Sequence, residues 1–206
     1  MFCVLGDCYK EECHNCFPVK FCKYNHYECK TKGMCYDTEL YKSDIIVTGC
    51  AGFIGHHVCI KLLEEEFKVL GIDNMNDYYD PRLKEARLAE LECFENFTFK
   101  KADIAEKEEL TSTFKSFNPE KVVHLAAQAG VRYSIEHPYA YLDANLTGFL
   151  NILELCRHNK VDGLIYASSS SVYGANTKIP FSLDDQADHP VCLYGATKKA
   201  NELMAH

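Results

Sequence analysis

Residues 45–55 read Ile-Ile-Val-Thr-Gly-Cys-Ala-Gly-Phe-Ile-Gly, and this stretch decides the fold. The β-branched run that opens it predicts a short buried strand. Three glycines follow, and residues 56–66 then carry apolar side chains at helical spacing. Gly49 would allow a tight turn, Gly52 a close approach of backbone amides to a pyrophosphate, and Gly55 close packing of helix on strand. Strand, glycine-rich turn and helix indicate the first unit of a dinucleotide-binding fold.

A second predicted strand, Phe67–Ile72, ends at an acidic residue. Asp73 lies 24 residues after Gly49. A carboxylate at this place accepts hydrogen bonds from the adenosine ribose hydroxyls and repels a 2′-phosphate, which favours NAD over NADP. The alternative is an ordinary loop aspartate, but the strand in front of it favours the ligand role.

Strands and helices continue to alternate along the rest of the chain. Further strands are predicted at 97–101, 122–125 and 163–167, and helices at 81–93, 106–117, 139–157 and 190–205, the last after its first turn. Regular alternation at this spacing implies a parallel sheet with ligands at the carboxyl ends of its strands. The predicted fold class is therefore α/β, a Rossmann-like doubly wound parallel sheet.

The composition of the 206 residues is that of a soluble globular protein, with 47% hydrophobic and 25% charged residues. No apolar run is long enough to span a membrane, and none near the N-terminus is long enough for a signal peptide. The net charge of −8 counts against general nucleic-acid binding, which needs clustered Lys and Arg. We expect a cytoplasmic protein that binds neither nucleic acid nor membrane.

Residues 1–42 differ from the rest of the chain and are predicted to be a Cys-rich extension, with the dinucleotide-binding domain at 43–206. They hold seven of the twelve cysteines but only four Val, Leu or Ile residues, too few for a core. Cys13-x-x-Cys16 with His14 and His26 suggests zinc, although no second clip follows. Disulfides would need an oxidising compartment. The favoured interpretation is a poorly ordered extension, with an ordered zinc or disulfide module as the alternative. We assign no metal ligand.

The reacting groups are predicted near the end of the chain. Tyr194 and Lys198 are four residues apart, so on a helix they share a face, and the ammonium would favour a phenolate at Tyr194. A phenolate beside a nicotinamide can take a proton from a substrate hydroxyl while hydride leaves the same carbon. Ser168–Ser171 follows the fifth predicted strand and offers hydroxyls at its carboxyl end. A solvated helix face and a serine-rich turn are the alternatives for these two features.

With these motifs in view, the chain from about residue 44 resembles the extended short-chain dehydrogenase/reductase superfamily, specifically its NAD-dependent sugar-nucleotide epimerases and dehydratases. The motifs are TGCAGFIG (48–55), Asp73-Asn74, Asp103-Ile104, HLAA (124–127), SSSSVYG (168–174) and YGATK (194–198). Finer features look like UDP-glucuronate 4-epimerases, namely DNMNDYYD (73–80), LKEAR (83–87), AGVRYS (129–134) and KKANELM (198–204).

The resemblance implies a role for each matching residue. The implied catalytic residues are Ser169, Tyr194 and Lys198, and the implied substrate contacts are Ser169, Ser170 and Tyr194. The implied NAD-binding residues are Gly49, Gly52, Phe53, Ile54 and Gly55 at the phosphates, Asp73 and Asn74 at the ribose, Asp103 and Ile104 at the adenine, and Leu125, Ala126 and Ala127 with Tyr194 and Lys198 at the nicotinamide side. Asn145 would lie on the helix behind the site.

The implied activity is 4-epimerisation of a nucleoside-diphosphate sugar, UDP-glucuronate to UDP-galacturonate, through a 4-keto intermediate. A 4,6-dehydratase would carry an Asp-Glu pair after its catalytic Ser or Thr, where this chain has Ser170-Ser171. A decarboxylase and a non-catalytic NAD-binding fragment stay open. Proteins of the family continue through a C-terminal substrate domain, so we expect the 206 residues to be truncated, inactive alone, and homodimeric when full length.

Overall fold

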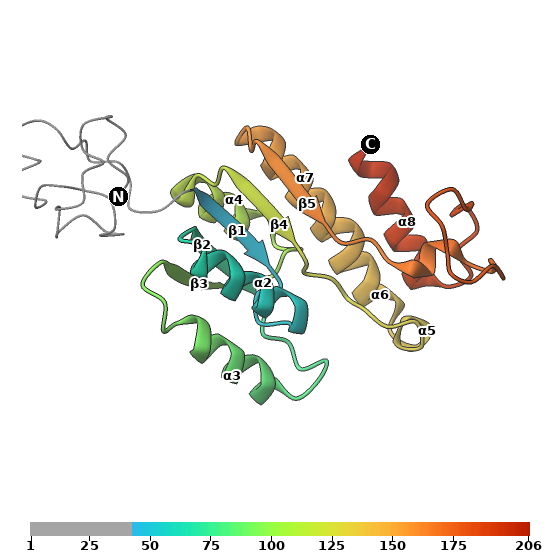
Figure 1. Ribbon diagram of the computed structural model, residues 1–206, viewed down its shortest axis with the longest axis horizontal. Coiled ribbons are helices and arrows are strands. Elements are labelled where there is room, and N and C mark those ends of the chain that lie inside the picture. The colour runs from blue at the N-terminus through green and yellow to red at the C-terminus, as the bar shows by residue number, and fades with distance from the viewer. Residues whose placement is uncertain (1–42) are drawn as a thin grey trace, which may run out of the picture. The chain divides into compact units, whose positions relative to one another are not determined.

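The computed structural model describes residues 43–206 (Figure 1). The predicted Cys-rich extension, with its zinc and disulfide alternatives, lies outside the described residues. The strands are β1 (Asp44–Thr48), β2 (Lys68–Asp73), β3 (Phe97–Lys101), β4 (Lys121–His124) and β5 (Gly163–Tyr166). The longer helices are α2 (Phe53–Glu64), α3 (Pro81–Leu91), α4 (Lys107–Phe117), α7 (Phe149–His158) and α8 (Leu193–Ala205). Shorter helical segments are α5 (Tyr133–Glu136), α6 (Pro138–Tyr141), η2 (Leu142–Gly148) and η3 (Ser170–Tyr173).

The five strands form one parallel sheet in the order β3-β2-β1-β4-β5. β1 is the central strand, with β2 on one side and β4 on the other. The chain therefore moves outward from β1 to β3, returns to the middle, and moves outward again to β5. This reversal creates a crevice at the carboxyl ends of the strands next to β1, where doubly wound folds bind ligands. The predicted Rossmann-like α/β fold is confirmed.

Helices cover both faces of the sheet, and alternate side chains of β1, β2 and β4 supply both cores. On one face Ile46 of β1 packs with Leu110 and Phe114 of α4 and with Ile152 of α7. On the other face, the cluster comprises Ile45, Val47, Cys50, Cys59, Leu63, Val69, Leu91 and Phe97, from β1, α2, β2, α3 and β3. Figure 1 shows α2 and α3 on one side of the sheet and α4 and α7 on the other. The near-continuous apolar runs of β1 and β2 follow from this burial on both faces.

The turn after β1 brings backbone segments so close that side chains do not fit between them. Gly49 has φ +74°, and a Cβ there would lie 2.8 Å from the backbone nitrogen of Ala126. A Cβ on Gly55 would lie 2.0 Å from the carbonyl oxygen of Gly49. The predicted roles of these two glycines in the turn and in the packing of α2 agree with this geometry.

The predicted helix at 139–157 is not a regular α-helix. It consists of α6, a π-helical segment η2 and α7 in succession. Two contacts explain the wider turn. Asn145 in η2 bonds with its side chain to the backbone of Gln128, and Gly148 approaches Ile104 so closely that a Cβ would lie 2.6 Å from it. Such π-helical turns are frequent at functional sites.

The other predicted elements are present with ends that shift by a few residues. The largest shift is at α2, which begins at Phe53 instead of His56, because the tight glycine turn lets the helix start directly after Gly52.

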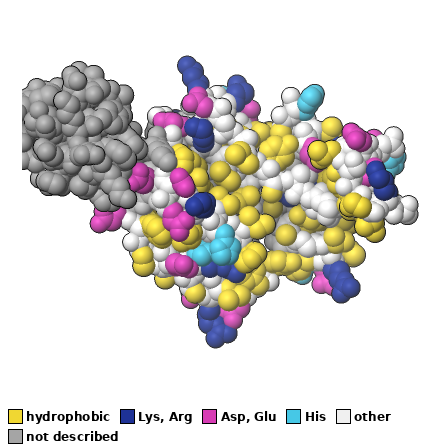
Figure 2. All heavy atoms as spheres, viewed as in Figure 1, with side chains coloured by type: hydrophobic (Ala, Val, Ile, Leu, Met, Phe, Trp, Pro, Cys, Tyr) yellow, Lys and Arg dark blue, Asp and Glu magenta, His cyan; other side chains and the backbone are white. Residues whose placement is uncertain are grey.

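None of the helices in residues 43–206 is long and apolar enough to cross a bilayer. Figure 2 shows hydrophobic side chains across the middle of the face in view and charged ones mainly toward its edges. On the edge strand β5, Ile165 is 67% exposed.

Substituting Gly55→Ala tests the close contact between the turn and α2. Alanine is favoured over glycine inside helices by about 1 kcal/mol, so helix propensity alone predicts a gain. The clash with the Gly49 carbonyl should instead lower the free energy of unfolding by about 1–3 kcal/mol in urea titrations. The control is Gly163→Ala, where no heavy atom lies within 4 Å of the added Cβ and no loss is expected. Equal stability of both variants would contradict the contact.

Candidate functional site

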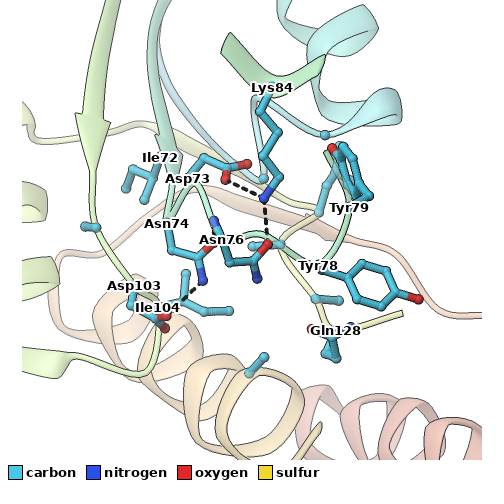
Figure 3. A pocket seen from close by; sticks show the side chains of 17 residues that line it. Ile72, Asp73, Asn74, Asn76, Tyr78, Tyr79, Lys84, Asp103, Ile104 and Gln128 are labelled. Carbon is cyan, nitrogen blue, oxygen red and sulfur yellow. Dashed lines mark hydrogen bonds and ion pairs between the residues drawn. The ribbon is translucent and has the colours of Figure 1, made fainter. Parts of the chain in front are cut away.

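A pocket of about 680 Å³, part of it open to solvent, lies at the carboxyl ends of β1, β2, β3 and β4 (Figure 3). The lining comes from five segments of the chain: Gly49 and Gly52; Ile72, Asp73, Asn74, Asn76, Tyr78, Tyr79 and Lys84; Ala102, Asp103 and Ile104; Leu125, Ala126, Ala127 and Gln128; and Ala144. It occupies the crevice that the strand order creates.

The N-terminus of α2 lies at the glycine-rich edge of this pocket. Its N-cap is Gly52, no side chain caps the helix, and its first turn has no acidic residue. The backbone amides of the first turn therefore keep their donors for another acceptor, and the helix dipole favours an anion there. This is the arrangement that binds the pyrophosphate of dinucleotides.

Asp73, at the end of β2, is buried and bound on several sides. Its Oδ2 accepts from the backbone N–H of Ala51 at 3.2 Å, and its Oδ1 from that of Met75 at 2.9 Å. The Lys84 ammonium lies 3.3 Å from Oδ1, and both side chains are 6% exposed. Lys84 also donates to Oδ1 of Asn76 at 2.8 Å (Figure 3). The carboxylate thus joins the glycine turn to α3, and its charge is balanced within the site.

Two other predicted cofactor residues contact each other next to Asp73. The Asn74 amide donates to Oδ2 of Asp103 at 2.9 Å, as Figure 3 shows. The other oxygen of Asp103 accepts from the backbone N–H of Ala105 at 2.9 Å. Ile104 is buried against Gly148 of η2. These bonds fix one end of the pocket, where β2 and β3 terminate.

The opposite wall, residues 125–127, is held by a buried pair from β1 and β4. Thr48 Oγ1 accepts from the backbone amides of Leu125 and Ala126, each at 3.2 Å, and lies 2.7 Å from Nδ1 of His124. Because this oxygen accepts two amides, its own proton points to Nδ1. Burial, with the nearby Lys198 charge, lowers the pKa of His124 to about 3, so the ring is neutral and Nδ1 can accept.

Asn145 connects the pocket wall with α8. Its Oδ1 accepts from the backbone N–H of Gln128 at 2.8 Å, and its Nδ2 donates to the Gln128 carbonyl at 3.0 Å and to Oγ1 of Thr197 at 3.1 Å. Asn201 of α8 donates to the Asn145 carbonyl at 2.6 Å. The resemblance implies a position for Asn145 on the helix behind the site, and in the structure it lies in η2, bonded to the pocket-lining Gln128. A shift of α8 would therefore move the wall of the pocket.

The predicted catalytic residues Ser169 and Tyr194 belong to two neighbouring segments, η3 with its N-cap and α8. A Cβ on Gly195 of α8 would lie 2.7 Å from the carbonyl oxygen of Ser171, so the helix and the serine segment are in close contact. Ser169 is the N-cap of η3, and its Oγ accepts from the backbone N–H of Ser171 at 3.2 Å. The half-buried ring of Tyr194 packs edge-on against Tyr141, with 6.1 Å between ring centroids.

Lys198 is buried at 4% exposure, one helical turn after Tyr194. Its ammonium donates to the Ala167 carbonyl, beyond the end of β5, at 3.0 Å. The structure thus gives Lys198 a backbone partner, whereas the sequence analysis places it beside the Tyr194 hydroxyl. Burial lowers the pKa of Lys198 to about 8, so it is still mostly protonated at pH 7.

The pocket gathers nine of the residues predicted to bind the cofactor: Gly49, Gly52, Asp73, Asn74, Asp103, Ile104, Leu125, Ala126 and Ala127. The remaining site residues, Phe53, Ile54, Gly55, Ser169, Ser170, Tyr194 and Lys198, do not belong to its lining. Sequence reasoning gave no role to Asn76, Tyr78, Tyr79, Lys84 or Gln128, all of which line the pocket. The sequence held one signal for Lys84. It lies on the same helix face as the apolar Leu88 and Leu91, and a lysine on a buried face needs a charged or polar partner inside the protein.

The sequence profile of a family described as GDP-mannose 4,6 dehydratase matches residues 46–206. The chain belongs to this family. Among curated proteins, the chain is 57% identical over 162 residues to Protein CapI of Staphylococcus aureus, covering 79% of this chain and 48% of the relative. It is 51% identical over 163 residues to UDP-glucuronate 4-epimerase 4 of Arabidopsis thaliana, covering 79% of this chain and 37% of the relative.

The fold also matches solved structures of NAD-dependent epimerases. One is the UDP-glucuronic acid 4-epimerase of Bacillus cereus in complex with UDP-glucuronic acid and NAD, with a TM-score of 0.72 and 35% identity. The match covers 79% of this chain and 51% of that one. The chain thus spans about half the length of the family members it matches, or less.

The burial of Lys198 predicts a pH dependence of stability. Its pKa is about 8 in the folded protein and about 10.4 in an unfolded chain, so between these values the unfolded state binds more protons. Below pH 8 the buried charge destabilises the fold, and this penalty is relieved as the pH rises from about 8 to 10.4. In urea titrations the wild type should therefore gain up to about 3 kcal/mol relative to Lys198→Met over this range.

The control for this measurement is Lys115→Met, an exposed position on α4. The difference in unfolding free energy between this variant and the wild type should not change with pH. If the difference in unfolding free energy between Lys198→Met and the wild type also stayed constant with pH, the lowered pKa of Lys198 would be contradicted.

Proposed function

We propose that the chain carries the NAD-binding half of a UDP-sugar 4-epimerase, with UDP-glucuronate as substrate and UDP-galacturonate as product. The observation that carries this proposal is the pocket at the carboxyl end of β1, in which the uncapped N-terminus of α2 meets the buried Asp73. The named activities of the relatives, and the NAD in the Bacillus cereus complex, support the cofactor and the substrate class.

The residues of the pocket fit NAD. We propose that the phosphates lie against Gly49 and Gly52, whose missing side chains leave room for them, and bind the backbone amides at Phe53, Ile54 and Gly55. Asp73 and Asn74 would bind the adenosine ribose. Asp103 and Ile104 would flank the adenine, and Leu125, Ala126 and Ala127 the nicotinamide side. The carboxylate of Asp73 has acceptor capacity left beyond its three bonds, since an ionised carboxylate offers about four lone-pair sites.

The proposed chemistry is proton transfer by Tyr194 at the C4 hydroxyl of the sugar, with Ser169 and Ser170 as hydrogen-bonding partners. When bound, NAD accepts the C4 hydride and later returns it to the opposite face of the 4-keto sugar. Lys198 contributes its positive charge from a site shielded from water, where a charge acts more strongly than in solvent. Because His124 is neutral, it places no second positive charge beside the Lys198 ammonium.

The positions after Ser169 favour epimerisation over dehydration, although the family profile has a dehydratase's description. Elimination of water needs an acid and a base beside the reacting carbons. The two positions after Ser169 are Ser170 and Ser171. Serine hydroxyls do not titrate near neutral pH, so they cannot supply this acid and base.

Asp73 is expected to set the preference for NAD over NADP. Titration of the 206-residue chain should give a dissociation constant about tenfold or more lower for NAD, because the carboxylate binds ribose hydroxyls and repels a 2′-phosphate. Asp73→Asn should narrow this preference, since Lys84 then faces the ribose without an opposing charge. Asp77→Asn is the control, because Asp77 is exposed in the same loop and does not line the pocket. Equal or tighter binding of NADP by the wild type would contradict the role of Asp73.

Tyr194→Phe should abolish turnover and leave NAD binding nearly unchanged, because the phosphates are held on other loops. The expected loss is about 10²–10⁴-fold, the range for a general acid–base group. Because the chain spans about half of its relatives, the assay uses it fused to the part of the Bacillus cereus enzyme that it does not cover, and measures UDP-galacturonate formed with NAD present.

Two controls complete this assay. Tyr139→Phe, at a position 77% exposed on α6, should keep full activity. The 206 residues alone should give no useful turnover, because holding the sugar in reacting geometry supplies about 7–11 kcal/mol of the barrier reduction. Activity of Tyr194→Phe within a few-fold of the parent would remove Tyr194 from the mechanism. The homodimer, the cytoplasmic location and the absence of nucleic-acid binding stay predictions.

A further inference from the structure

The loop between β2 and α3 is anchored at both ends and carries Tyr78 between its anchors. Near its start, the Asn74 amide donates to Asp103 at 2.9 Å, and Asn76 accepts from Lys84 at 2.8 Å. At its end, Asp80 is the N-cap of α3 and accepts from the backbone N–H of Arg82 at 3.0 Å. Both ends of the loop are therefore fixed on the side of the sheet where β2 and β3 end.

Tyr78 itself contacts the other side of the pocket. A Cβ on Gly130 would lie 2.7 Å from the Tyr78 hydroxyl, so this hydroxyl occupies space that only glycine leaves open. The Tyr78 ring also packs edge-on against Tyr133 of α5, with ring centroids 4.9 Å apart. We call Gly130 and Tyr133 the seat of Tyr78.

The seat is rigidly held. Tyr141, which is fully buried, donates with its hydroxyl to the carbonyl oxygens of Ala129 and Gly130. The Tyr133 ring packs on His137 with 4.2 Å between centroids. Tyr78 is by contrast 41% exposed, and its ring is the part of this contact that can move away without disturbing the core.

The strand order shows what this contact crosses. The Tyr78 loop follows β2 and the seat follows β4, and β1 lies between these two strands. When these two segments touch, they bridge the carboxyl end of β1, where the glycine turn is located. Tyr78 lines the pocket, and in Figure 3 its ring extends from the loop on the same side of the pocket as Gln128.

We propose that Tyr78 is a cofactor-retaining residue: seated on Gly130 and Tyr133, it closes the crevice over the bound dinucleotide and slows its release. The inference rests on the proposed NAD binding. An enzyme that returns its hydride in every cycle has no need to exchange its cofactor, and each exchange interrupts turnover. Tyr78 thereby acts on the lifetime of the complex, whereas Asp73 and the glycine turn act on recognition.

The test measures the release of labelled NAD from the 206-residue chain after a chase with excess unlabelled NAD. Tyr78→Ala should release NAD about three- to tenfold faster than the wild type, the range for losing one aromatic pair. Tyr133→Ala should do the same, because it removes the seat. The double variant should be no faster than either single variant, since both substitutions break one contact. The association rate should not fall in any of them.

Two further variants keep the result interpretable. Tyr78→Phe removes only the hydroxyl at Gly130 and should accelerate release less than Tyr78→Ala, even if the larger substitution impairs folding. Tyr139→Ala removes an exposed tyrosine outside the pocket and should release NAD at the wild-type rate.

The outcomes separate the two proposals. Wild-type release rates in Tyr78→Phe and Tyr78→Ala, or additive effects of Tyr78→Ala and Tyr133→Ala, would overturn the retaining role while NAD binding stands. A wild-type chain that retains no label would contradict the proposed function itself, and the retaining role with it.

Discussion

The approach of three backbone segments at the end of β1 is the constraint on which the site depends. Gly49 lies against the backbone of Ala126, and Gly55 lies against the carbonyl of Gly49, at distances that no side chain tolerates. This contact places the N-terminus of α2 at the crevice between β2 and β4, with its amides uncapped. Without it, the N-terminus of α2 and the carboxylate of Asp73 would not face the same pocket.

A second set of bonds joins this glycine-rich edge of the pocket to the helix that carries Tyr194 and Lys198. Thr48 holds the backbone of Leu125 and Ala126, and Asn145 holds Gln128 on one side and Thr197 on the other. The side chains of Thr48, Asn145 and Thr197 are buried, where an unpaired polar group would destabilise the fold by about 1–3 kcal/mol. The π-helical segment η2 is part of this connection, because it carries Asn145, whose side chain bonds to the backbone of Gln128.

The sequence predicts the fold and the glycine turn because both depend on local patterns. Apolar runs, helical spacing and glycines at fixed intervals are visible without any knowledge of tertiary contacts. Helical spacing puts Lys84 on an apolar stripe but does not identify Asp73 as its partner, which lies eleven residues away. The seat of Tyr78 was missed because it depends on a contact between segments far apart in the sequence. The π-helix was missed for the same reason, since the contacts of Asn145 with Gln128 and of Gly148 with Ile104 join distant segments of the chain. Lys198 shows the limit of helical spacing, which puts it on one face with Tyr194 but does not reveal the Ala167 carbonyl as its hydrogen-bond partner.

The most direct test of a dinucleotide site at the carboxyl end of β1 is an NMR titration of the labelled chain with NAD. Backbone amides of Gly49–Gly55, Asp73, Asn74, Asp103, Ile104 and Leu125–Gln128 should show the largest shifts, and these should saturate together. Amides of α4 and of the C-terminal turn of α7 should change little, because both lie away from the pocket. Shifts that do not saturate, or that centre on the loop at residues 174–190, would contradict this account.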